Sequence, residues 1–132
     1  MTMKKYLLLP VIMLTILCCT QSQPAQEGQV INVNATEFKK LVDAGKGTIL
    51  DVRTPEETSE GRIAGAVIID FQTPDFSNQI SKLDKSKEVY VYCEGGGRSS
   101  DAAQMLRKKG YKVYNLEDGF ADWKRMKFPV EQ

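Results

Sequence analysis

The sequence predicts a single α/β domain built around a doubly wound, mostly parallel sheet of about five strands flanked by helices. Three observations support this prediction. From Val30 onward, short apolar runs alternate with amphipathic stretches, as they do where strands feed helices. No internal repeat or low-complexity tract interrupts that alternation. The 132 residues, 42% of them hydrophobic and 27% charged, suit one ordinary globular domain.

The first predicted pair of elements is a strand over residues 30–33 followed by a helix. Asn34 and Glu37 have the spacing of an N-cap residue and its capping-box partner. Gly45 supplies the residue that ends this helix. Apolar residues at helical spacing give the helix a buried face: Phe38, Leu41 and Val42.

The middle of the domain contains two further predicted strands, over residues 48–52 and 66–69. Between them, Pro55 occupies the first turn of a short helix. Residues 75–83 have apolar side chains at spacings that predict another helix before the next turn.

The fourth predicted strand, residues 88–92, consists mainly of β-branched and aromatic residues and runs directly into a glycine-rich loop. A helix over residues 99–109, with Ser99 as its N-cap, follows the loop. A last strand over residues 112–114 and a helix over residues 120–126 complete the domain. Ligand sites of parallel sheets lie at the carboxyl ends of the strands, and Cys93 occupies such an end.

Composition excludes several classes of function. The formal net charge of +1 offers no basic field for nucleic acid. The absence of histidine excludes Cys-His and Ser-His nucleophile pairs and His-containing zinc sites. We therefore expect neither a metal nor a cofactor. Three cysteines are too few for a disulfide framework, and only Cys93 lies in the body of the domain.

Residues 1–19 have the pattern of an export signal. Lys4 and Lys5 precede an apolar run of 12 residues, which is shorter than the roughly 20 that a membrane-spanning helix needs. The run ends in a segment that resembles a bacterial lipobox, with Cys19, or alternatively Cys18, as the lipidated residue. Cleavage a few residues later, near Ser22 or Ala25, would instead give a soluble periplasmic protein.

Residues 20–29 are polar, contain Pro24 and Gly28, and read as a flexible linker ahead of a domain over residues 30–132. The expected location is the periplasmic side of a bacterial membrane, with the lipid as the only membrane attachment. An exported thiolate in an oxidising compartment further implies a reducing or sulfur-relay partner.

The loop after the fourth strand combines the features of an activated thiol. Gly95, Gly96 and Gly97 allow positive φ, so that successive amides can turn inward and surround an anion. The following helix directs its positive end at the loop, and Arg98 adds donors for an oxyanion. Together these features favour the thiolate of Cys93 without a histidine base, which makes Cys93 a candidate nucleophile.

Residues 93–99 also resemble the C-x-x-G-x-R-S loop of single-domain rhodanese-like sulfurtransferases. Residues 49–57 and 61–67 are similar to two further motifs of that family, and residues 110–123 to its closing strand and helix. The resemblance implies that Cys93 takes a sulfane sulfur from a thiosulfate-type donor, holds it as a persulfide and passes it to cyanide or a thiol. It also implies that Glu94 through Ser99 bind the persulfide and donor, supported by the paired charges of Asp51 and Arg53.

Glu94, directly after the nucleophile, puts the donor in question. A carboxylate facing the pocket would oppose a dianion such as thiosulfate and disfavour the Cys93 thiolate. The sequence does not decide which way Glu94 points.

Three other readings remain. In a persulfide-relay or binding module, Cys93 would accept persulfide from a partner, and the isolated protein would show little catalytic turnover. Phosphatases and arsenate reductases have C-x5-R loops, whereas only four residues separate Cys93 from Arg98. A thiol–disulfide redox function is disfavoured because the predicted domain contains no second cysteine that could resolve a mixed disulfide at Cys93.

Overall fold

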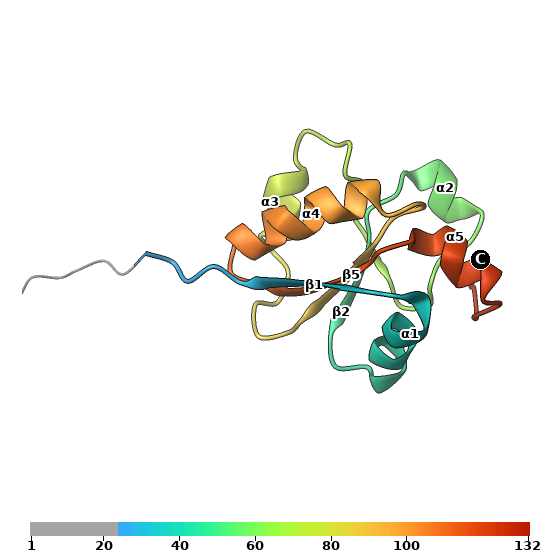
Figure 1. Ribbon diagram of the computed structural model, residues 1–132. Coiled ribbons are helices and arrows are strands. Elements are labelled where there is room, and N and C mark those ends of the chain that lie inside the picture. The colour runs from blue at the N-terminus through green and yellow to red at the C-terminus, as the bar shows by residue number, and fades with distance from the viewer. Residues whose placement is uncertain (1–23) are drawn as a thin grey trace, which may run out of the picture.

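Five parallel strands form one sheet in the order β1-β5-β4-β2-β3 (Figure 1). The computed structural model describes residues 24–132, so the predicted signal segment and the lipidation candidates Cys18 and Cys19 lie outside the described residues. The predicted α/β class and the doubly wound parallel sheet are confirmed. The strands are β1 (Gln29–Val33), β2 (Thr48–Asp51), β3 (Val67–Ile68), β4 (Val89–Tyr92) and β5 (Lys112–Leu116).

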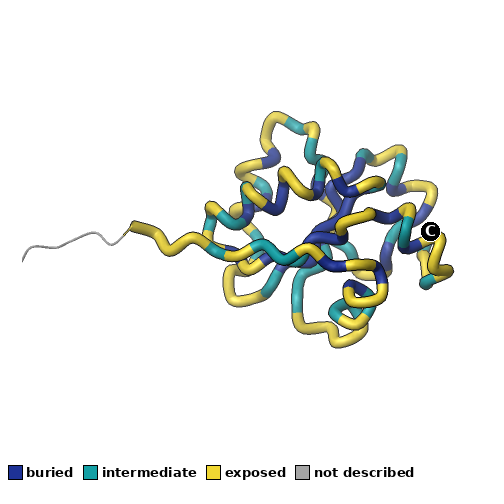
Figure 2. Tube along the Cα trace, viewed as in Figure 1, coloured by how far each residue is buried: buried dark blue, intermediate teal, exposed yellow. Residues whose placement is uncertain are grey.

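Helices cover both faces of this sheet. They are α1 (Ala35–Ala44), α2 (Pro55–Ser59), α3 (Phe76–Ile80), α4 (Gly97–Lys108) and α5 (Gly119–Arg125). Alternation along β4 separates two cores, because Val89 and Val91 pack with α3 and α4 whereas Tyr90 and Tyr92 pack with α1 and α5. β4 is buried along its whole length and lies in the middle of the sheet (Figure 2).

Local sequence signals set both ends of α1 and the start of α2. The Asn34 side chain accepts a hydrogen bond from the Glu37 amide, and Gly45 closes α1 in the left-handed conformation. Thr54 and Glu57 form a reciprocal capping box at α2, with Pro55 in its first turn. The backbone therefore enters α1 and α2 through contacts made by neighbouring residues.

Other boundaries differ from the predictions. The third strand is two residues long rather than four, because only Val67 and Ile68 pair with β2. The predicted helix over residues 75–83 shortens to five residues, after which Tyr111 holds the backbone by donating its hydroxyl to the Leu83 carbonyl at 2.7 Å. The last strand runs two residues further than predicted, to Leu116, because β1 pairs with it along its full length.

The end of the predicted linker contacts the domain. Gln29 is the first residue of β1, and the Gly28 amide donates to the Arg107 carbonyl at 2.8 Å. The chain therefore enters the domain beside the carboxyl end of α4, far from the end at which α4 begins (Figure 1). Within residues 24–132, no helix combines the length and apolar character needed to cross a membrane.

Phe38 connects the core beneath α1 to its neighbours. Its ring is fully buried and meets the rings of Tyr90, Tyr92 and Trp123 edge to face, with centroids 6.2–6.3 Å apart. Such pairs add to the free energy gained by burying each ring.

Replacing Phe38 with alanine should lower the free energy of unfolding by about 3–5 kcal/mol, because it leaves a cavity among three aromatic rings. Urea denaturation measures this loss. Lys40→Ala, on the exposed face of the same helix, should change stability by less than about 0.5 kcal/mol. Equal losses in both variants would contradict the assignment of this core.

Candidate active site

Cys93 follows the buried strand β4 and is only 1% exposed. Its Sγ accepts hydrogen bonds from the backbone amides of Gly96, at 3.1 Å, and Ser99, at 3.4 Å. The Ser99 hydroxyl lies 3.5 Å from Sγ and donates to the Gly96 carbonyl at 3.1 Å. Two amides at the start of α4 thus converge on the sulfur, where they stabilise negative charge.

The three glycines of the loop are not equivalent. Gly96 alone has a positive φ, of 100°, and a Cβ there would lie 2.0 Å from the Glu117 carbonyl oxygen. A Cβ at Gly95 or Gly97 would meet nothing within 4 Å. All three glycines allow positive φ, and the structure uses that freedom at Gly96. Within residues 24–132, the glycine amide that donates to Sγ is that of Gly96.

The predicted N-cap role of Ser99 is also wrong. Helix α4 begins at Gly97, two residues earlier than expected, and its N-cap is Gly96, whose left-handed backbone sets the helix start. Ser99 lies fully buried in the first turn, beside the sulfur. This earlier start is what brings the Ser99 amide to Sγ.

The turn between β5 and α5 holds the loop from the opposite side. The amides of Phe120 and Ala121 donate to the carbonyls of Cys93 and Glu94, at 2.8 and 3.1 Å. Gly119, with φ of 70°, lets the backbones approach, since a Cβ there would lie 2.3 Å from the Glu94 carbonyl oxygen. These backbone contacts hold the Cys93 loop against the start of α5.

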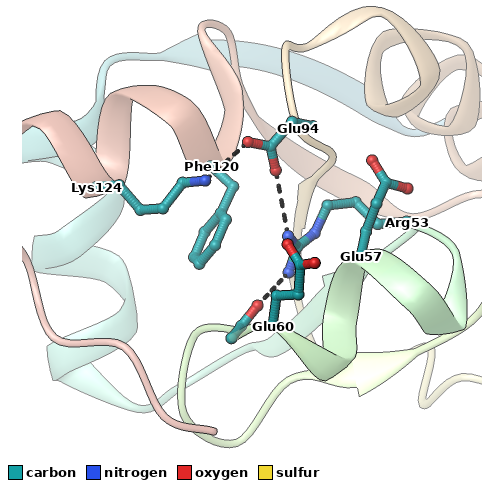
Figure 3. Close-up of a pocket in the computed structure, with 7 residues that line it drawn as sticks. Arg53, Glu57, Glu60, Glu94, Phe120 and Lys124 are labelled. Carbon is teal, nitrogen blue, oxygen red and sulfur yellow. Dashed lines mark hydrogen bonds and ion pairs between the residues drawn. The ribbon is translucent and has the colours of Figure 1, made fainter.

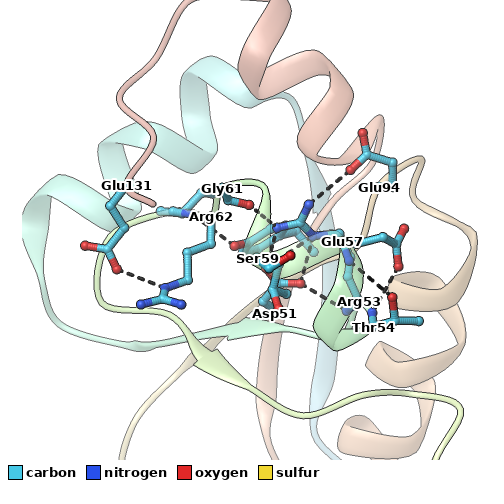
Figure 4. Close-up of polar contacts among 12 residues, drawn as sticks. Asp51, Arg53, Thr54, Glu57, Ser59, Gly61, Arg62, Glu94 and Glu131 are labelled. Atoms are coloured by element: carbon cyan, nitrogen blue, oxygen red, sulfur yellow. Dashed lines mark hydrogen bonds and ion pairs between the residues drawn. The ribbon is translucent and has the colours of Figure 1, made fainter.

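Asp51 and Arg53 form a buried ion pair beneath the loop (Figure 4). The Arg53 guanidinium, 2% exposed, donates to the Asp51 carboxylate at 2.8–3.2 Å and to the Gly61 carbonyl at 2.8 Å. Burial opposes its charge, but the hydrogen bonds and charge of Asp51 outweigh that effect and raise the pKa of Arg53. The ion pair therefore has a structural role, because the Arg53 guanidinium donates to groups of the protein itself.

Glu94 faces a cavity of about 190 Å³ at this edge of the sheet (Figure 3). Its carboxylate binds Arg53 at 3.2 Å and Lys124 at 2.9 Å, so one cation that follows β2 and one from α5 offset its charge. The structure thus places the Glu94 carboxylate toward the cavity. The lining residues are Arg53, Glu57, Glu60, Gly61, Glu94, Phe120 and Lys124.

Arg98, expected to offer its guanidinium to an oxyanion, is engaged by Glu57. The two side chains form a bidentate pair with distances of 2.7 and 2.8 Å. This pair lowers the pKa of Glu57 from 4.5 to about 2, and hydrogen bonding to Glu57 raises the pKa of Arg98. A donor's oxyanion would have to compete with a carboxylate for Arg98.

Sequence reasoning missed Glu57, Glu60, Phe120 and Lys124 as members of the site. Glu57 lies within residues 49–57, which resemble a family motif, and its position three residues after Thr54 is a recognisable capping signal. Lys124 and Phe120 reach the cavity from α5 through tertiary packing that no local pattern records. Within residues 24–132, no group of three or more potential ligands is placed to hold a metal ion.

Comparison with known proteins identifies this arrangement. Residues 34–126 match the model of the rhodanese-like domain. The chain belongs to the rhodanese-like family. It is 31% identical over 93 residues to a sulfurtransferase of Allochromatium vinosum, covering 70% of this chain and 85% of that protein. It is 33% identical over 119 residues to thiosulfate sulfurtransferase 16 of Arabidopsis thaliana, covering 81% of this chain and 98% of that protein.

Solved structures of the family share the fold. A rhodanese-related protein of Thermoplasma volcanium superposes with a TM-score of 0.69 at 28% identity, over 76% of this chain and 96% of that one. The chain spans only 32% to 49% of three longer curated relatives. Rhodanese-like domains thus occur both as small proteins and within larger ones, and sulfur transfer is the activity that the family relationship supports.

Gly96→Ala should lower the free energy of unfolding by at least about 2 kcal/mol, because the new Cβ meets a backbone carbonyl at a residue with positive φ. Gly97→Ala adds the same group in open space within a helix and should leave stability unchanged or slightly raised. Thermal denaturation of the two variants side by side measures the difference. A loss of similar size in both would refute the loop geometry.

The pair of Glu57 and Arg98 predicts a pH dependence. Because the pKa of Glu57 is lower in the folded chain, its stabilising effect is complete above pH 4.5 and disappears as the pH falls toward 2. Partial exposure limits the effect to on the order of 1 kcal/mol. Urea unfolding between pH 5 and about 2.5 should therefore show a shallower slope in Glu57→Gln than in the parent chain. Identical slopes would mean that the pair contributes nothing.

Proposed function

We propose that this chain is a sulfurtransferase in which the Cys93 thiolate carries the transferred sulfur. The observation that carries the proposal is the convergence of the Gly96 and Ser99 amides on Sγ at the positive end of α4. In a family whose named members include sulfurtransferases, this arrangement suits an anionic sulfur that alternates between thiolate and persulfide.

The reaction needs no histidine. The Cys93 thiolate attacks the sulfane sulfur of a thiosulfate-type donor, the donor's sulfur–sulfur bond breaks, and sulfite or a thiolate leaves with the bonding electrons. A thiol or cyanide then attacks the outer sulfur of the Cys93 persulfide and regenerates the thiolate. Both leaving groups are stable anions, so neither half-reaction depends on a general acid.

A relay is the second candidate, because a relative that matches 69% of this chain is named a putative sulfur carrier protein. With Cys93 1% exposed, a protein partner that delivers or receives persulfide would have to approach the loop closely. Such a partner explains how a chain could carry a persulfide and turn over slowly with small acceptors.

Intact mass of the purified chain should show a gain of one sulfur atom after incubation with thiosulfate or 3-mercaptopyruvate, and cyanide should remove it. Cys93→Ser should gain nothing under the same conditions. Sulfur loading that survives this substitution would disprove the role of Cys93. Loading without turnover would favour the relay.

We further propose that the protein is exported and held at the periplasmic side of a bacterial membrane by a lipid on Cys19. The segment that enters the domain meets the carboxyl end of α4, whereas the Cys93 loop lies at its amino end. Twelve helical residues separate these ends by about 18 Å. A tether at residues 20–28 would therefore join the domain at the end of α4 opposite to the Cys93 loop.

Cys19→Ser should move the protein from the membrane fraction to the soluble fraction and abolish labelling by a radioactive fatty acid, because the acceptor thiol is lost. Cys18→Ser serves as the matched control and should retain both. The reverse pattern would assign the lipid to Cys18. Unlabelled protein in all three forms would favour a plain periplasmic protein.

A further inference from the structure

Cationic side chains gather at the end of the domain where the parallel strands begin. The segments that lead into β2, β4 and β5 meet there with the end of α3 and the last turn of α4. These segments form a basic face, whose exposed or half-buried cations are Lys46, Lys82, Lys85, Lys87, Arg107, Lys108, Lys109 and Lys112.

Hydrogen bonds join the segments of the basic face to one another. The Lys85 ammonium donates to the Lys109 carbonyl at 2.8 Å, which joins the segment before β4 to the end of α4. The Thr48 amide donates to the Glu88 carbonyl at 2.8 Å, which joins the starts of β2 and β4. The cations are therefore held on one side of the domain.

Carboxylates do not balance the basic face. Within residues 24–132, Arg107 forms an ion pair with Glu27. Lys112 forms another with Glu88 at 3.1 Å. Asp84 is the one other carboxylate on the described segments that form this face. Six lysines outside ion pairs thus face a single carboxylate, which leaves a local excess of positive charge.

The opposite end of the domain, which carries the Cys93 loop, has exposed carboxylates instead. Those that make no ion pair within the described part of the chain follow or belong to α2 and the β5–α5 turn: Glu56, Glu60, Glu117 and Asp118. The formal net charge of +1 therefore conceals a separation of charge between the two ends of the domain.

The chain enters the domain beside the basic face. The Gly28 amide donates to the Arg107 carbonyl at 2.8 Å, and the Gln29 amide donates to the Tyr111 carbonyl at 3.2 Å. Figure 1 shows the incoming segment on the side where α4 ends. Cys19, the proposed lipidation site, precedes Gly28 by nine residues, which span at most about 30 Å. A lipid on Cys19 would keep the basic face near the membrane surface.

The composition of the basic face fits a lipid surface better than a protein partner. Seven of its eight cations are lysines. Lysine is depleted at protein interfaces, where arginine and aromatic residues are enriched. Near an anionic membrane, in contrast, each lysine strengthens binding by about fivefold through its charge alone.

A cavity of about 340 Å³ between α3 and α4 supplies a place for a headgroup on the basic face. Its lining residues are Ser77, Met105, Lys108 and Lys109. Ammonium and hydroxyl groups are donors that suit phosphate oxygens. The face therefore combines phosphate-binding groups with an excess of positive charge.

We propose that the basic face binds anionic phospholipid headgroups and docks the domain on a membrane. The choice of a membrane rests on the proposed export and lipid anchor, whereas the proposed sulfur transfer does not enter the argument. Docking by this face leaves the Cys93 loop, at the other end of α4, on the side away from the lipid.

Vesicle binding tests the proposal. The purified full chain carries Cys18→Ser and Cys19→Ser, so that no acyl chain contributes. It is mixed at low ionic strength with vesicles of phosphatidylcholine, alone or with equimolar phosphatidylglycerol, and the bound fraction is measured by sedimentation. The anionic vesicles should bind at least about tenfold more tightly, and high salt should remove this preference. Equal binding to both vesicles overturns the proposal.

Charge reversal assigns the preference to the basic face. Lys87→Glu combined with Lys108→Glu should reduce it at least about tenfold. Lys40→Glu combined with Lys127→Glu changes the net charge equally at exposed positions outside the basic face and should retain most of it. Residues 1–17 are common to all variants and cannot cause a difference between them. Equal loss in the two double variants, or no loss in either, overturns the proposal.

Two further outcomes separate this proposal from its neighbours. Retention of the chain on immobilised polyglutamate without a preference for anionic vesicles overturns it in favour of an acidic protein partner. Protein that takes up no fatty acid in cells but prefers anionic vesicles supports the basic face and overturns the lipid anchor alone. Loading of Cys93 with sulfur should be the same in Lys87→Glu/Lys108→Glu as in the parent chain, so failure of docking leaves sulfur transfer intact.

Discussion

The guanidinium of Arg53 is the interaction on which the candidate site depends. It joins the end of β2 through Asp51, the turn after α2 through the Gly61 carbonyl, and the Cys93 loop through Glu94. A buried charge is tolerated only where partners satisfy it, and here its donors meet carboxylate or carbonyl oxygens while its plane stacks on Phe120. The end of β2, the turn that follows α2 and a loop 41 residues further along the chain are thereby fixed relative to one another.

Backbone contacts between the Cys93 loop and the β5–α5 turn add to the restraint that Arg53 provides. Gly96 and Gly119 allow the Cys93 loop and the β5–α5 turn to approach more closely than any side chain would permit. The resulting hydrogen bonds, from Phe120 to the Cys93 carbonyl and from Ala121 to the Glu94 carbonyl, restrain the loop while the amides of α4 are directed at the sulfur. A preorganised loop stabilises negative charge on sulfur without reorganising when a persulfide forms.

The charges of the site explain how a protein without histidine can stabilise a thiolate. Negative charge on sulfur is stabilised by amides and by the helix end, which leaves the neighbouring ionised side chains free for another task. Those side chains pair with one another across α2, β2 and α5, so that they set the net charge of the entrance rather than that of the sulfur. The sulfur and the cavity entrance are thus surrounded mainly by different groups.

Alternating apolar runs and capping signals were enough to predict the α/β class, the order of the elements and the position of Cys93 at a strand end, because these features depend on residues close in sequence. The ends of helices and strands that depend on contacts with distant parts of the chain were predicted less well. The third strand shortens where its pairing with β2 stops, and α4 starts at Gly97 because the left-handed Gly96 packs against the carbonyl of Glu117. Ser99, a good N-cap by composition, was displaced into the helix for the same reason.

The sequence by itself determined that the domain carries one thiol and no imidazole, and that this thiol precedes a glycine-rich turn and a helix. Only the tertiary structure decided that Glu94 faces the cavity, that Arg98 is tied to Glu57, and that Lys124 and Phe120 reach the site from α5. The physical reason is that a charged side chain takes whichever partner the folded chain brings within about 3 Å. Those partners lie 30 to 41 residues away along the chain, beyond the reach of any local pattern.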